Sequence, residues 1–127
     1  MAFSGLGRRV AAPGHRPGGD FETSACRAAE NLAAAAFGIA VSAVRQANRG
    51  RAEIALARHT AMYLAHTSLG LSLSSVGRQF GRDRTTVAHA IARIEDRRDE
   101  PAFDRLIDWL AAALELWRAG FLRGGRP

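Results

Sequence analysis

The polar residues from Asp83 to His89 form the part of this sequence with the most specific chemistry. They occur in the segment Ser72 to Ile94, SLSSVGRQFGRDRTTVAHAIARI, in which two helical patterns flank Gly81. Threonine methyl groups can pack against thymine methyls, histidine can donate to a purine acceptor, and arginine can bond guanine O6 and N7 together. The segment therefore predicts a helix-turn-helix that presents DNA-contacting groups from the first two turns of its second helix.

The second helix of this motif divides into a buried side and an outward side. Four apolar residues spaced i, i+3, i+4 and i+7 are predicted to be buried. They are Val87, Ala90, Ile91 and Ile94. Asp83 is a good N-cap, because its carboxylate can accept from a free backbone N–H. The residues expected to face outward are Arg82, Arg84, Thr85, Thr86 and His89. The alternative is that the threonines only cap the helix and the arginines are solvated.

The rest of the sequence predicts further helices and no strands. Helical patterns cover about residues 23–37, a short helix that ends near Ala47, residues 52–68 and residues 102–118. The last of these has an apolar side with helical spacing. Its members are Phe103, Leu106, Ile107, Leu110, Leu114 and Trp117. The expected fold class is all-α: a compact domain of five to six helices that contains a helix-turn-helix.

The domain organisation is expected to be simple. Residues 1–20 hold several glycines, prolines and arginines and are interpreted as a flexible basic tail. A helical DNA-binding domain is expected at 21–120, with the helix-turn-helix at about 72–98, and a short tail at 121–127.

His59 and His66, seven residues apart, are not spaced as metal ligands on one helix usually are. We therefore expect no metal and no cofactor.

The charge balance points to a polyanionic partner. The 127 residues include 18 Lys+Arg and 12 Asp+Glu, which gives a formal net charge of +6. Every cation is an arginine, which a GC-rich genome would also produce.

Cys26 is the only cysteine, so no intrachain disulfide can form, and a reducing cytoplasm fits. No apolar run is long enough to span a membrane. We expect a cytoplasmic, nucleoid-associated protein that contacts no membrane and has no small-molecule substrate. No arrangement of nucleophile and base appears, so an enzyme with catalytic residues is not expected.

The segment FGRDRTTVAHAIARIE closely resembles the signature of the C-terminal DNA-binding domain of the bacterial replication initiator DnaA, FGGRDHTTVxHAxxKI. The preceding ARHTAMYLAHTSLGLSLSSVG is similar to that family's ARxxAMYLxxxxxxxSLxxIG. The resemblance extends from about Thr23 to about Glu100. It implies the TrpR-like helical fold of that domain and sequence-specific binding of double-stranded DNA at boxes like TTATNCACA. The implied role is regulation of replication initiation, or of genes that contain such boxes.

The resemblance also implies roles for individual residues. Those implied to read bases in the major groove are Asp83, Arg84, Thr85, Thr86 and His89. Arg84 stands where the commoner family member has histidine, and one glycine of the family's pair is missing before Arg82. Those implied to contact phosphate or the minor groove are Arg49, Arg51, Arg58, Ser72, Ser74 and Arg82.

DnaA couples this domain to an AAA+ ATPase module, which the present sequence gives no sign of. It contains no G-x-x-x-x-G-K-[ST] motif and no lysine. Two alternatives remain open. One is a protein-interaction module that binds the full-length replication initiator or another replication protein through the 102–121 helix. The other is a helix-turn-helix transcription regulator unrelated to replication.

Overall fold

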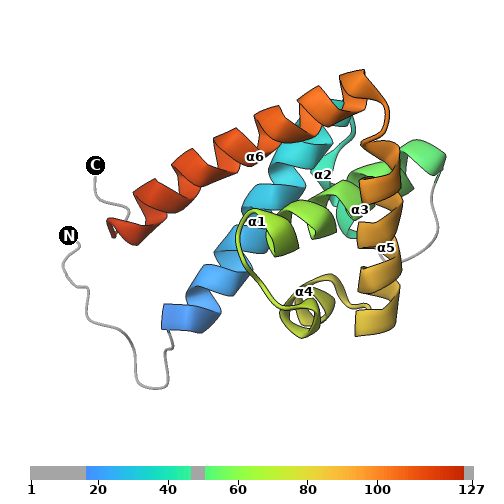
Figure 1. The fold of residues 1–127 in the computed structure, drawn as a ribbon. Helices are drawn as coiled ribbons and strands as arrows, with labels where there is room; N and C mark the ends of the chain where they lie inside the picture. The colour runs from blue at the N-terminus through green and yellow to red at the C-terminus, as the bar shows by residue number, and fades with distance from the viewer. Residues whose placement is uncertain (1–16, 47–50, 125–127) are drawn as a thin grey trace.

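Six α-helices make up the described part of the chain, which in this computed structural model is residues 17–46 and 51–124 (Figure 1). The helices are α1 (Pro17–Phe37), α2 (Val41–Arg45), α3 (Ala52–Thr67), α4 (Leu73–Phe80), α5 (Arg84–Arg97) and α6 (Pro101–Leu122). Those two ranges contain no strand. The all-α prediction and the short second helix are therefore confirmed.

The outermost helices are longer than predicted. α1 begins at Pro17 rather than near Thr23, and α6 ends at Leu122 rather than near residue 118. Proline is well tolerated in the first turn of a helix, whereas the glycines that follow it gave no helical signal. The end of α6 is held by tertiary packing, since the ring of Phe21 on α1 lies 5.9 Å from that of Trp117 and 5.5 Å from that of Phe121, centroid to centroid. The predicted tails at residues 1–20 and 121–127 are therefore too long, because residues 17–20 belong to α1 and residues 121–122 belong to α6. Their remaining parts, residues 1–16 and 125–127, lie outside the described residues.

α3 is the central helix, and α1, α2, α4 and α5 all pack against it (Figure 1). Its interior run from Ala57 to Ala65 is buried on nearly every side. Small side chains such as Ala57, Ala61 and Ala65 let neighbouring helices approach closely, while Met62 and Leu64 fill the core. A helix surrounded in this way has apolar residues around most of its circumference. This explains why α3 contains more apolar residues than a single core-facing stripe would need.

The helix-turn-helix is formed by α4, a turn at Gly81 and α5. Ser72 caps α4, because its Oγ accepts from the backbone N–H of Ser75 at 3.0 Å. Gly81 has φ +68°, in the left-handed region that glycine adopts at little cost, and the N–H of Arg82 returns to the carbonyl of Gly77 at 2.9 Å. Asp83 then caps α5. The predicted motif and its predicted caps are thus confirmed.

The far end of α5 is tied to α3 and α6 by Arg98. Its guanidinium donates to the Tyr63 hydroxyl at 3.0 Å, to Asp108 at 2.6 Å and to Asp104. The hydrogen bond that Arg98 donates to Asp104 raises the pKa of Arg98 above its ordinary value. Tyr63 donates in turn to Glu95 on α5 at 3.1 Å. This network fixes the orientation of α5 against the central helix.

Candidate nucleic-acid interface

The polar residues at the start of α5 lie on its solvent side. Arg84, Thr85, Thr86 and His89 are exposed. On the opposite side Val87, Ala90 and Ile94 are buried in the core and Ile91 is partly buried, as predicted. With 3.6 residues per turn, Arg93 continues the row formed by Thr85 and His89, and it too is exposed. We call the five exposed residues, Arg84, Thr85, Thr86, His89 and Arg93, the α5 outer face.

Asp83 orders the first turn of this helix. Its Oδ1 accepts from the backbone N–H of Thr86 at 2.7 Å. This backbone hydrogen bond, followed by one from the Thr86 side chain, holds the pKa of Asp83 below its ordinary value. The helix cap is therefore the aspartate and not either threonine, which weakens the alternative that the threonines serve only as caps. A carboxylate at this position remains an acceptor that a cytosine amino group could use.

Arginines from three elements lie in the neighbourhood of His59 on α3. Burial lowers the pKa of His59 on α3, and the charges of Arg93, Arg58 and Arg82 lower it further. Burial, with the nearby charge of Arg82, likewise lowers the pKa of Arg58. These effects place Arg58, Arg82 and Arg93 in the neighbourhood of His59. A concentration of positive charge of this kind attracts a phosphate backbone.

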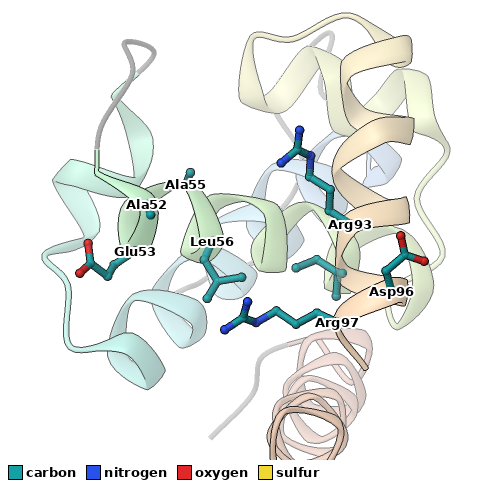
Figure 2. Close-up of a pocket in the computed structure, with 8 residues that line it drawn as sticks. Ala52, Glu53, Ala55, Leu56, Arg93, Asp96 and Arg97 are labelled. Carbon is teal, nitrogen blue, oxygen red and sulfur yellow. The ribbon is translucent and has the colours of Figure 1, made fainter. Parts of the chain in front are cut away.

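Arg93 was not among the residues predicted for the site. Its spacing of i+4 from His89 and i+8 from Thr85 was the available signal, because those intervals share one side of a helix. It also lines an open groove of about 670 Å³ between the first turn of α3 and the end of α5 (Figure 2). Arg97 reaches from α5 toward Leu56 across this groove. Arg93 is therefore part of the α5 outer face and also lies beside the groove that borders the start of α3.

Arg58 lies inside the protein rather than on its surface, with 7% of the residue exposed. Its Nε donates to the carbonyl of Val44 at 3.0 Å, and its Nη2 donates to the carbonyl of Gln46 at 2.9 Å. These bonds fix the end of α2, just before residues 47–50. The phosphate contact predicted for Arg58 stays a prediction, and the structure adds a second role, which is to position this segment.

Residues 30–94 match the model of the bacterial DnaA protein helix-turn-helix, which is about half of the chain. The chain belongs to this family. It is 45% identical over 69 residues to the chromosomal replication initiator protein DnaA of Symbiobacterium thermophilum, a match that covers 53% of this chain and 15% of the relative. The DnaA protein of Gluconobacter oxydans is 38% identical over 81 residues, which are 62% of this chain and 17% of the relative. The DnaA protein of Brucella abortus is 50% identical over 50 residues, which are 39% of this chain and 10% of the relative.

The chain therefore corresponds to a small part of these relatives, and the family match ends at Ile94 within α5. The residues that match the DnaA helix-turn-helix family include the whole of α4 and most of α5. The single glycine before Arg82 suffices for the turn, because Gly81 alone adopts the positive φ there. The whole of α6 lies outside the family match.

The remaining predicted contact residues are distributed around the same region. Arg51 is exposed at the N-cap of α3. Ser72 and Ser74 are exposed at the start of α4, and Arg82 donates to the carbonyls of Phe80 and Gly81 at 3.3 and 3.4 Å. Arg49 falls within residues 47–50, outside the described residues.

Within residues 17–46 and 51–124 there is no group of three or more His, Cys, Asp or Glu side chains that could hold a metal ion. His66 instead contacts the carbonyl of Leu71 through Nδ1 at 2.7 Å, which ties the end of α3 to the next loop. None of the helices described is long and apolar enough to cross a membrane.

Proposed function

We propose that the chain binds double-stranded DNA sequence-specifically at sites resembling the DnaA box, TTATNCACA. The observation that supports this most directly is the exposure of Thr85, Thr86 and His89 at the start of a helix whose opposite side is buried. A helix of a helix-turn-helix reads the major groove with the residues of its first turns. Membership of the DnaA helix-turn-helix family supports the same function.

Binding would divide into positioning and reading. Positioning contacts to phosphate are assigned to Arg51, Ser72, Ser74, Arg82 and Arg93, which surround the start of α5. They supply affinity that falls with salt and carries no sequence information. Reading is assigned to Asp83, Arg84, Thr85, Thr86 and His89. Arg84 is long enough to bond guanine O6 and N7 together, a preference that a histidine at the same place would not share.

The relatives, which are chromosomal replication initiator proteins, support a biological role in replication. We propose that the chain regulates replication initiation, or genes with such boxes, by occupying these sites in the nucleoid. We propose it as a DNA-binding domain at 21–120, not an enzyme. The full-length replication initiator or other replication proteins remain candidate partners.

Replacing Thr86 with alanine is expected to cost about 2 kcal/mol of discrimination between a box and a scrambled duplex. Thr86→Val keeps a methyl group and loses the hydroxyl, whereas Thr86→Ser does the reverse, so the pair separates thymine contact from hydrogen bonding. Competition binding of each variant measures the effect. If Thr86→Ala discriminated between the two duplexes as well as the wild type does, Thr86 would not be one of the residues that read bases.

Replacing Arg93 with alanine is expected to weaken every duplex alike and to reduce the slope of log K against log salt by about one unit. The reason is that Arg93 lies near other arginines around His59 and not in the first turn of α5. Binding titrations across a salt series measure the slope. A loss confined to one sequence would instead make Arg93 a base reader.

A further inference from the structure

The solvent side of α6 has two large apolar side chains with no cover from the chain's own core. Trp109 and Leu116 are each 77% exposed, although both are large. They are seven residues apart, which is close to two helical turns, so they lie on one side of the helix. Ala112 and Ala113 lie between them. The opposite side packs inward through Phe103, Ile107, Leu110 and Leu114. We call Trp109, Ala112, Ala113 and Leu116 the α6 outer face.

Single exposed apolar residues are common on soluble proteins, but an aligned pair on one helix forms a continuous strip. Leu122 shows the difference, since it is also exposed, at 62%, but lies about 140° around the helix from Trp109 at 100° per residue. α6 is 22 residues long and falls outside the part of the chain that matches the DnaA helix-turn-helix family. The strip is therefore not explained by DNA reading.

We propose that the α6 outer face binds a second copy of the chain as an antiparallel helix pair. In a two-fold pair every contact occurs twice, so a face that is large at one point and small at a neighbouring point can complement itself. An antiparallel register that sets Trp109 of one copy against Ala112 of the other places the indole over the smallest part of the strip. The same register sets Arg105 opposite Leu116 of the other copy and one residue from Glu115, and both charged residues are exposed.

The length of α6 lets the contact extend beyond Trp109 toward the area that a specific pair must bury. Because symmetry counts each side chain twice, Trp109 alone would bury on the order of 300 Å². A specific interface needs roughly 1,000 Å² in total. A helix of 22 residues is about 33 Å long. Leu116, the two alanines and the aliphatic part of Arg105 extend the contact along that length. Alanines at the centre permit the short interaxial distance that close packing requires.

Pairing through α6 leaves the DNA-facing elements free. α6 runs along one edge of the molecule and contacts α1, while α4 and the start of α5 lie at the opposite edge (Figure 1). Two copies joined through α6 would therefore present two separate α5 outer faces. Self-association requires no DNA and does not depend on the proposed box recognition.

Sedimentation equilibrium of the full chain without DNA tests this proposal. We expect the wild-type mass to rise from monomer to dimer with concentration, and Trp109→Glu and Leu116→Glu each to raise the dimer Kd at least about tenfold. Leu122→Glu is the matched control, since it places the same charge at an exposed leucine of the same helix, and it should leave the Kd unchanged. A monomeric wild type at every concentration would overturn the proposal, as would a Leu122→Glu effect equal to that of Trp109→Glu.

Fluorescence gives an independent readout of the surface used. Trp117 packs against Phe21 and Phe121, so Trp117→Phe is a conservative change that leaves Trp109 as the only tryptophan. Burial of Trp109 in the pair should shift its emission to the blue as concentration rises. Association without such a shift would place the interface elsewhere and overturn the proposal.

Discussion

Replacing Gly77 with alanine is expected to lower the free energy of unfolding by about 3 kcal/mol, at the upper end of the range for overpacking. A Cβ at this position would lie 2.5 Å from the carbonyl oxygen of Arg82. Because that oxygen belongs to the backbone of the turn, the clash can be relieved only by moving the turn away from α4. Alanine is a better helix former than glycine by about 1 kcal/mol, so the clash must first offset that gain.

Gly81→Ala is the matched control for this prediction. Gly81 has φ +68°, but a Cβ there would meet nothing within 4 Å. Only the backbone conformation is penalised, at a cost of about 1 kcal/mol. Chemical denaturation of both variants measures the difference. Equal losses at the two positions would show that conformation, and not the close approach of α4 to the turn, governs the stability of the motif.

Replacing Arg58 with alanine is expected to lower the free energy of unfolding by about 3 kcal/mol. The change removes two charge-assisted hydrogen bonds and leaves the carbonyls of Val44 and Gln46 without this donor. Arg58→Lys should recover only part of the loss, because an ammonium group lacks the planar arrangement of donors that reaches two carbonyls. Thermal and chemical denaturation measure the effect in the absence of DNA.

Arg51→Ala provides the comparison for Arg58. Arg51 is exposed, so its loss should change stability by less than about 0.5 kcal/mol and act on DNA affinity instead. If Arg58→Ala left stability unchanged and only weakened DNA binding, the positioning role would be wrong and the phosphate contact would be sufficient.

The helix-turn-helix could be predicted from the sequence because its determinants are local. Gly81, the Asp83 cap and the spacing of Val87 and Ile94 all act within one or two turns, so the pattern specifies both helices and their inward side. The α5 outer face follows from the same periodicity. The same periodicity places Arg93 away from the buried side, although Arg93 was not predicted to contact DNA.

The features that sequence reasoning missed depend on contacts between distant residues. Arg58 donates to the carbonyls of Val44 and Gln46 at the end of α2, and Arg98 donates to the hydroxyl of Tyr63, which is 35 residues away. No local pattern distinguishes a buried arginine of this kind from one that contacts phosphate. The end of α6 was missed for the same reason, because Phe121 is held by the ring of Phe21 on α1.

Selection of duplexes from a randomised pool by the full chain, at about 150 mM salt, tests the central claim most directly, because non-specific phosphate binding is weak there. The account predicts enrichment of one motif related to TTATNCACA, with the enrichment reduced in Thr86→Ala and retained in Arg93→Ala. A pool that stays random after selection, in a chain that still binds duplexes at low salt, would contradict it.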